Sequence, residues 1–364
     1  MAAGDASPHP LDAAGLRERV QSIVDSVLDQ ESAVLARAGE DLLPLAAALR
    51  GLMGGGKRLR PAFCYWGWRG AGGDADSPLD DAAMQAAASL EFLQACALIH
   101  DDVMDGSETR RGLPAVHHRF ANLHRGEEWR GSPEAFGVGA AILVGDLCLA
   151  WADQVLMNAD FPKEALRRAQ PIYELMRTEL MAGQYLDLQE QARGGGSIDR
   201  ARTVVRYKSA KYTIERPLHI GAALAGAPEE LFSVYSAYGL PLGEAFQLRD
   251  DILGVFGDPG ETGKPAGDDL REGKRTILIA MTVDRATPAQ QSEIRQHLGD
   301  PALEPAGIEL MREIITETGA LAQTEALIEQ QFGQALAALE SPTLDDEARA
   351  ILRSLADAAA HRKG

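Results

Sequence analysis

The stretch MQAAASLEFLQACALIHDDVMD, residues 84–105, indicates the fold class of this chain. Over residues 84–99 its apolar side chains fall on nearly every side of a helix instead of forming a single stripe. A helix that is apolar all round is buried, so we expect this one to lie at the centre of the molecule. It ends in three aspartates, Asp101, Asp102 and Asp105, which places acidic groups at the end of a buried element.

The rest of the chain has the pattern of an all-α protein. Ala, Leu, Glu, Gln and Arg dominate, and alternating strings of Val, Ile and Thr are missing. A second run, residues 138–150, also predicts a helix that is buried on all sides. Breaks rich in Gly and Pro fall at residues 54–56, 70–78, 106–114, 194–196, 226–228 and 258–267. None of these is a long linker, so we predict one large helical domain over residues 11–364, after a loose tail over residues 1–10.

Composition narrows the possible functions. The chain has 364 residues, 45% of them hydrophobic and 25% charged, which is typical of a globular protein. Its formal charge of −18 disfavours binding to nucleic acid. Three cysteines without a CxxC spacing indicate a reducing compartment, and we expect a cytoplasmic protein. No uncharged apolar run reaches the roughly 18 to 20 residues of a membrane span, so we expect no transmembrane segment.

The first acidic cluster has the geometry of a metal site. At about 100° per residue, Asp101, Asp102 and Asp105 fall within one arc of the helix, where their carboxylates could share hard divalent cations. An isolated DDxxD is more often a solvated acidic turn. Here the preceding turns are apolar, so the carboxylates need a metal or cationic side chains to compensate their charge.

A second acidic pair, Asp250 and Asp251, follows an apolar stretch that predicts a helix from about Phe232. Gln247 lies three residues before Asp250 and therefore on the same face of that helix. The loop that follows returns two lysines, Lys264 and Lys274, towards the acidic end.

Cations also gather in the segments GGKRLRP, residues 55–61, and RRG, residues 110–112. A Gly-rich loop that enters a helix offers backbone N–H groups to phosphate, and paired guanidiniums bind phosphate in a bidentate manner. The spacing is not that of a P-loop. Two acidic clusters, each followed by cations, predict a cavity in which Mg²⁺ bridges carboxylates to a diphosphate leaving group.

In their order, these motifs resemble those of the trans-prenyl diphosphate synthase family, also called the polyprenyl synthetases. The resemblance covers residues 55–276 and includes GGKRLRP, EFLQA, LIHDDVMD, AILVGD, GQYLD, KSAK, FQLRDDILGVFGD and TGKPAGDDLREGKRT. It implies a single antiparallel helical bundle around a deep central cavity, usually a homodimer. It also implies condensation of isopentenyl diphosphate with an allylic diphosphate (dimethylallyl, geranyl or farnesyl) through ionisation, condensation and elimination, assisted by Mg²⁺.

The resemblance assigns roles to individual residues. Asp101, Asp102, Asp105, Asp250 and Asp251 would hold about three Mg²⁺ ions that bridge to the allylic diphosphate. Contacts to the allylic diphosphate match Arg110, Lys208, Ser209, Gln247, Lys264 and Lys274, with Lys208 also taking part in catalysis. Contacts to isopentenyl diphosphate match Lys57, Arg60, Gln94 and Arg111.

Three positions depart from the family pattern. Gln94 stands where bacterial members often have His, and Ser209 replaces the usual Thr but keeps the hydroxyl. Gly254 replaces the third Asp of the second acidic motif, which leaves two carboxylates there and admits a less active enzyme.

Product length should depend on the helix before Asp101. Ala97 and Cys96, one turn upstream, are small where members that stop at fifteen carbons commonly have an aromatic ring. The prenyl tail is therefore expected to pass them and stop near Leu93, about 12 Å from Asp101 at ~1.5 Å per residue. We predict a twenty-carbon geranylgeranyl product, with farnesyl or a longer polyprenyl product as alternatives.

Three other functions are weighed against this one. A class I terpene cyclase shares DDxxD, but its Asn/Asp-Ser/Thr-Glu motif is missing near Asp250. An HD-type hydrolase could use His100 and Asp101, yet the further histidines fall in or near a predicted loop. A non-catalytic subunit of a heteromeric synthase would typically have degraded acidic motifs, whereas the first motif here is intact.

Overall fold

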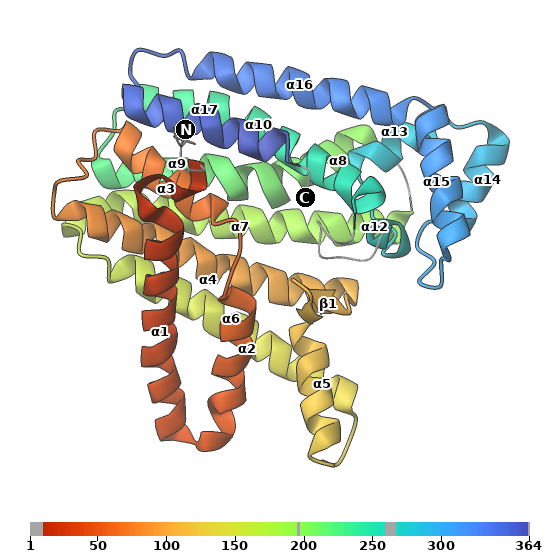
Figure 1. The fold of residues 1–364 in the computed structure, drawn as a ribbon, viewed down its shortest axis with the longest axis horizontal. Helices are drawn as coiled ribbons and strands as arrows, with labels where there is room; N and C mark the ends of the chain where they lie inside the picture. The colour runs from red at the N-terminus through yellow and green to blue at the C-terminus, as the bar shows by residue number, and fades with distance from the viewer. Residues whose placement is uncertain (1–9, 195–196, 259–266, 363–364) are drawn as a thin grey trace, which may run out of the picture.

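The structure, a computed structural model, describes residues 10–194, 197–258 and 267–362, and nearly all of its regular elements are helices (Figure 1). The N-terminal part contains η1 (Pro10–Gly15), α1 (Leu16–Ala38), η2 (Glu40–Leu42), α2 (Leu43–Met53), α3 (Leu59–Gly70) and α4 (Leu79–Asp105). The middle contains β1 (Thr109–Arg110), β2 (Leu113–Pro114), α5 (Val116–Gly126), α6 (Pro133–Met157), α7 (Lys163–Arg193), α8 (Ile198–Val204), η3 (Val205–Glu215) and α9 (Arg216–Ala225). The C-terminal part contains α10 (Glu229–Phe256), α12 (Asp268–Arg271), α13 (Ile277–Arg285), α14 (Pro288–His297), α15 (Pro305–Glu317), α16 (Ala320–Ala338) and α17 (Asp346–Ala360).

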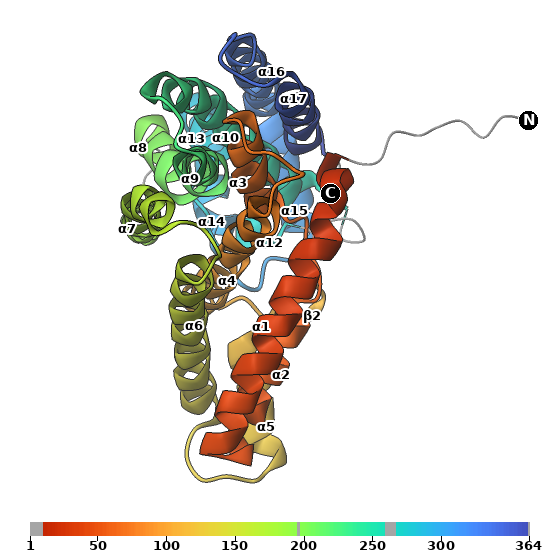
Figure 2. The same cartoon turned by 90° about the vertical axis from the view of Figure 1, so that its left-hand side faces the viewer.

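Helix α4 is the central helix that the sequence predicts. It packs against α6, α3 and α1, and Figure 2 shows α6 and α1 flanking it. Its buried residues include Ala87, Leu90, Phe92 and Ile99, which point in different directions around the helix. The all-α prediction and the buried position of this helix are confirmed.

A short hairpin follows α4 and departs from the purely helical prediction. Gly106 ends the helix in the left-handed conformation, at φ 67°, which a glycine adopts without steric cost. Strands β1 and β2, two residues each, then pair antiparallel within the predicted break at residues 106–114. This tight return carries Arg110 back towards the acidic end of α4.

The prediction that residues 138–150 are buried on all sides is wrong for one face of α6. Val138, Ile142 and Leu143 are exposed, Leu143 by 62%, because no element in the described part of the chain covers this face. By length and apolar composition α4 and α6 could each cross a membrane, but 78% of the apolar window in α4 is buried within the fold, against 39% in α6. Helix α4 is therefore a core helix, whereas α6 presents an apolar face.

The second acidic pair lies within its helix and not at its end, because α10 continues to Phe256. Element η3, a π-helix, packs between α7 and α10. Contact with α7 is very close at Gly183, where an added Cβ would lie 2.4 Å from the backbone nitrogen of Lys208. Glycine at this position lets the π-helix approach α7 and brings Lys208 towards α4.

Candidate active site

A cavity of about 810 Å³ collects most of the residues that the sequence assigns to the site. Its lining includes Lys57, Arg60, Gln94, Ala97, Asp101, Arg110, Arg111, Lys208, Ser209, Gln247, Asp250, Asp251 and Lys274. Four predicted residues, Asp102, Asp105, Cys96 and Leu93, do not line it. Lys264 lies outside the described residues.

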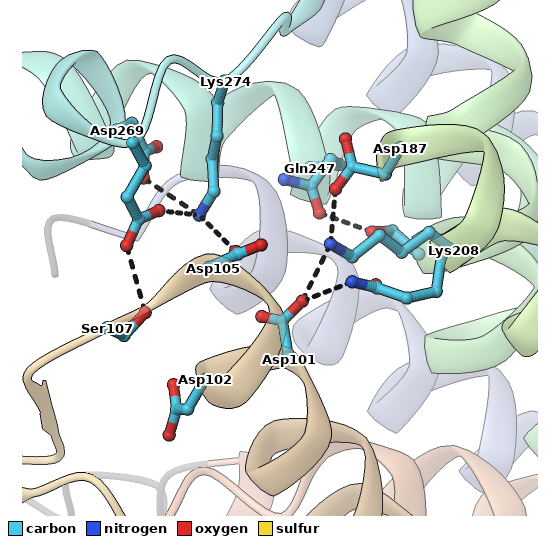
Figure 3. A network of polar contacts seen from close by, with 12 residues as sticks. Asp101, Asp102, Asp105, Ser107, Asp187, Lys208, Gln247, Asp269 and Lys274 are labelled. Carbon is cyan, nitrogen blue, oxygen red and sulfur yellow. Dashed lines mark hydrogen bonds and ion pairs between the residues drawn. The ribbon is translucent and has the colours of Figure 1, made fainter. Parts of the chain in front are cut away.

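Asp101 is the acceptor on which two neighbouring elements converge (Figure 3). Its Oδ1 lies 3.1 Å from Nζ of Lys208 on η3 and accepts a hydrogen bond of 2.8 Å from Gln184 on α7. Lys208 also lies 2.6 Å from a carboxylate oxygen of Asp187. Burial alone would raise the pKa of Asp101, but the charges of Lys208, Lys274 and Arg110 lower it to about 2. The carboxylate is therefore ionised at neutral pH.

Asp102 is turned away from this cluster, contrary to the expectation that all three aspartates share one site. Its carboxylate is buried and accepts hydrogen bonds from Arg110, one of them 2.9 Å long. Figure 3 shows it pointing away from Asp105 and Lys274. The physical reason is the hairpin, since Arg110 on β1 lies against the flank of α4 that carries Asp102.

Asp105 faces Lys274, whose Nζ lies 3.9 Å from it. Both carboxylate oxygens of Asp105 are buried and accept no hydrogen bond from the described residues. Burial and the nearby charge of Asp101 raise the pKa of Asp105 to about 6. Asp269 and Glu272, at 3.3 and 2.7 Å, also contact Lys274, and these acidic neighbours raise its pKa against the effect of burial. Lys274 thus stays charged beside the first acidic cluster.

The second acidic pair combines one buried and one partly exposed carboxylate. Asp251 accepts a hydrogen bond of 2.9 Å from Gln247, which in turn accepts one of 2.5 Å from Ser209. The other oxygen of Asp251 is buried and accepts none from the described residues, and burial raises the pKa of this group to about 8. Asp250 forms an ion pair with Arg362, whose guanidinium lies 4.0 Å from the ring centroid of Phe246.

The structure explains why a glycine stands at position 254. A Cβ at this position would lie 1.8 Å from Oδ2 of Asp269, so the carboxylate from α12 occupies the space that a side chain at position 254 would need. Asp269 also lines the cavity. The second acidic cluster therefore includes a third carboxylate that comes from a different helix.

The Gly-rich loop holds a separate group of cations. Arg111 donates hydrogen bonds to the carbonyl oxygens of Leu52 and Gly55, at 2.7 and 2.6 Å. Arg58 points into the protein instead and forms a buried ion pair with Glu91. Lys57 and Arg111 both have a lowered pKa, mainly because of burial and partly because other arginines lie nearby. An anion bound here would compensate this concentration of positive charge.

The donor set fits Mg²⁺ that is shared with a ligand. Within the described ranges no three Asp, Glu, His or Cys side chains converge closely enough to hold a metal ion by themselves. The buried oxygens of Asp105 and Asp251 that accept no hydrogen bond are, however, hard ligands without a donor. Diphosphate oxygens would complete the coordination that the two acidic clusters leave open.

Sequence reasoning did not assign several residues of the site. Gln184 and Asp187 carried a signal, since their spacing of three residues places them on one face of α7. Asp269 lies in the motif TGKPAGDDLREGKRT but was given no role, and Arg362 carried no signal, because the C-terminal segment reaches the cavity only through tertiary packing. Tyr212 and Thr213 were also missed, although they line the cavity next to Gln94 and Arg60.

Comparisons with known proteins agree on one family. The model of the polyprenyl synthetase family matches residues 44–315 of the chain. The chain is 43% identical to a geranylgeranyl pyrophosphate synthase from Corynebacterium glutamicum, whose crystal structure contains isoprenyl diphosphate and magnesium. That similarity covers 95% of this chain and 98% of the other, with a TM-score of 0.92.

Two curated relatives have different products. A geranylfarnesyl diphosphate synthase from Aeropyrum pernix is 33% identical over 85% of this chain and 92% of its own length. A (2E,6E)-farnesyl diphosphate synthase from Mycobacterium tuberculosis is 36% identical over 63% of this chain and 57% of its own length. The relatives thus share a reaction class and differ in the length of the product.

Proposed function

The chain belongs to the polyprenyl synthetase family, and on that premise we propose that it condenses isopentenyl diphosphate with an allylic diphosphate to give geranylgeranyl diphosphate. The observation that carries the proposal is the shared cavity. Carboxylates from both acidic clusters and two groups of cations line it, so two diphosphates can bind within one cavity. A site for a single anion would not need both groups of cations.

The residues of the chain divide between the two substrates. We assign Lys208, Arg110 and Lys274 to the allylic diphosphate, because they contact the acidic clusters where its metal ions would bind. Lys57 and Arg111, at the Gly-rich loop, are assigned to isopentenyl diphosphate. The allylic C–O bond then breaks with its electron pair on the diphosphate, and Lys208 and Lys274 stabilise the charge that develops.

The remaining steps form the new C–C bond and remove a proton, and water must be kept out of the cavity while they occur. The double bond of isopentenyl diphosphate supplies the electron pair of the new C–C bond, and a proton leaves to the released diphosphate. Leu98 and Leu180 contribute apolar surface to the cavity, which keeps water from the allylic cation. Mg²⁺, when bound by carboxylates of the two acidic clusters, supplies further positive charge to the leaving diphosphate.

The twenty-carbon product rests on the small side chain at position 97. Ala97 lines the cavity one turn before Asp101, so its methyl group leaves room for a prenyl tail. Cys96 and Leu93 are buried, and Sγ of Cys96 lies 3.7 Å from Nδ1 of His100. The Corynebacterium relative carries the same product name, which supports this choice over the fifteen- and twenty-five-carbon products of other relatives.

We also propose that the chain acts as a homodimer in the cytoplasm. The exposed apolar residues Val138, Ile142 and Leu143 lie on one side of α6, and Met181 and Tyr185 are exposed on α7. Exposed apolar residues grouped on one side of a helix typically mark a protein interface. A second copy of the chain that presents the same face would cover the exposed side chains of α6 and α7.

Turnover by the purified chain tests the proposal. Labelled isopentenyl diphosphate is supplied with dimethylallyl, geranyl or farnesyl diphosphate, in Mg²⁺ and in excess EDTA. We expect label in an organic-soluble product after dephosphorylation with Mg²⁺, and none with EDTA. No incorporation by the chain alone would contradict the proposal and favour a non-catalytic subunit, whereas a hydrocarbon released without phosphatase would favour a terpene cyclase.

A further inference from the structure

The π-helix η3 carries two residues, Tyr212 and Thr213, that contact the guanidinium of Arg60. The Arg60 guanidinium lies over the ring of Tyr212, with its central carbon 4.2 Å from the ring centroid. The same guanidinium donates a hydrogen bond of 2.8 Å to the hydroxyl of Thr213. The contact with the Tyr212 ring fixes the plane of the guanidinium, and the hydrogen bond to Thr213 fixes where its N–H group points. Arg60 is therefore held in one orientation.

Tyr212 also holds the second polar residue on this side of the cavity. Its hydroxyl donates a hydrogen bond of 2.7 Å to Oε1 of Gln94 on α4. Tyr212 is buried, and burial raises the pKa of its hydroxyl above the usual value although the charge of Arg60 opposes this. The phenol is therefore neutral near pH 7 and remains a donor. With its oxygen engaged, the Gln94 amide has a preferred orientation, and its NH₂ group remains available as a donor.

These contacts join the two halves of the site. Lys208 and Ser209, assigned to the allylic diphosphate, lie on the first half of η3, and Tyr212 and Thr213 follow on the next turn. All four residues line the same cavity as Arg60. A residue already fixed in position loses less conformational entropy when an anion binds, so this arrangement lowers the cost of binding at Arg60.

We propose that Tyr212 and Thr213 are positioning residues for isopentenyl diphosphate, which they serve by fixing the orientation of Arg60 and Gln94. The inference rests on the proposed function, because it takes Arg60 and Gln94 as contacts of that substrate. Neither residue needs to touch the diphosphate itself.

The test separates the KM for isopentenyl diphosphate from the KM for farnesyl diphosphate. Thr213→Val keeps the shape of the side chain and removes the acceptor, and it should raise the KM for isopentenyl diphosphate about threefold to tenfold. Tyr212→Leu removes both the ring and the hydroxyl and should raise it about tenfold or more. Tyr212→Phe keeps the ring under Arg60 and should cost only about twofold. The KM for farnesyl diphosphate should stay unchanged in all three.

A double-mutant cycle with Arg60→Met distinguishes positioning from a general loss of structure. Because Thr213 acts through Arg60, adding Thr213→Val to Arg60→Met should cause no further rise in the KM for isopentenyl diphosphate. Tyr207→Leu is the matched control, since Tyr207 lies on the same π-helix, contacts Lys211 and does not line the cavity. It should leave both KM values unchanged. Thermal unfolding of each variant identifies any that fail to fold, and Thr213→Val is the variant on which the conclusion depends.

This test and the test of the proposed function can fail independently of each other. No turnover by the unaltered chain contradicts the proposed function. Turnover with equal changes in both KM values, or an effect of Thr213→Val that persists in the Arg60→Met background, contradicts this inference alone.

Discussion

Asp101 is the carboxylate of the first acidic cluster that pairs with Lys208. Replacing it with Asn keeps its size but removes the charge that pairs with Lys208 and that would bind Mg²⁺. Since that charge matters most as the diphosphate departs, we expect Asp101→Asn to lower kcat by about 10²–10³-fold or more, with a smaller change in KM. Steady-state kinetics with farnesyl diphosphate measures this.

A control lies on the same helix. Asp81 is on the first turn of α4, its side chain is 95% exposed, and Asp81→Asn should leave kcat unchanged. If Asp101→Asn kept near-normal kcat, the assignment of the first acidic cluster to catalysis would be wrong.

The two groups of cations predict opposite kinetic effects. Lys57→Ala should raise the KM for isopentenyl diphosphate more than that for the allylic substrate, because Lys57 lies at the Gly-rich loop. Lys208→Ala should do the reverse, since Lys208 contacts Asp101 and Asp187. Initial rates with each substrate varied in turn measure both values, with Lys163→Ala, an exposed residue at the start of α7, as the control. Equal effects of Lys57→Ala and Lys208→Ala on the two substrates would refute the division.

At the scale of elements, the close packing of α7 against η3 positions Lys208. A Cβ at Gly183 would lie 2.4 Å from the backbone nitrogen of Lys208, and a backbone atom cannot move aside as a flexible side chain can. We expect Gly183→Ala to push η3 away from α7, lower the melting temperature and reduce kcat. Differential scanning calorimetry and steady-state kinetics on the same preparation measure the two effects.

Gly333→Ala provides the matched substitution. Gly333 is exposed within α16, and outside the neighbouring backbone of its own helix no atom of the described residues lies within 4 Å of the Cβ that the substitution adds. Here alanine should stabilise the helix by about 0.5–1 kcal/mol and leave activity unchanged. If Gly183→Ala behaved in the same way as Gly333→Ala, the packing at Gly183 would not control the position of Lys208.

Helical periodicity predicts some of these relations and misses others. The burial of α4 follows from apolar residues on all its sides, and the acidic groups at the end of α4 and within α10 follow from spacing alone. Periodicity also places Asp102 beside Asp101 and Asp105. In the structure, however, Asp102 accepts a hydrogen bond from Arg110, which the hairpin carries back to α4. The spacing of residues within one helix carries no information about a binding partner on another element.

At the scale of the whole molecule, the parts that sequence could not predict come from distant segments. Arg362 pairs with Asp250 because α17 packs against α3 and α10, which places the C-terminal segment beside the cavity. Asp269 fills the space at Gly254 because α12 packs against α10. The sequence therefore predicts a missing carboxylate at position 254, while the fold supplies one from elsewhere. The extent of the domain, residues 11–364, stays a prediction.

The apolar face of α6 predicts the oligomeric state. We expect the chain to be a dimer in solution and Leu143→Glu to give a monomer, because a charge on this face would be buried at the interface. Sedimentation equilibrium measures the mass. Leu43→Glu is the control, since Leu43 is 43% exposed at the start of α2. A monomeric unaltered chain, or a Leu143→Glu variant that remains dimeric, would contradict the proposed interface.

Chromatography of the dephosphorylated products reports both the reaction that the chain catalyses and the length of its product. Labelled isopentenyl diphosphate is incubated with dimethylallyl diphosphate and Mg²⁺, for the unaltered chain and for Ala97→Phe. We expect mainly the twenty-carbon alcohol from the unaltered chain and a shift to fifteen carbons when the ring of Phe narrows the cavity at position 97. A mainly fifteen-carbon product from the unaltered chain, or no shortening by a folded Ala97→Phe variant, would contradict it.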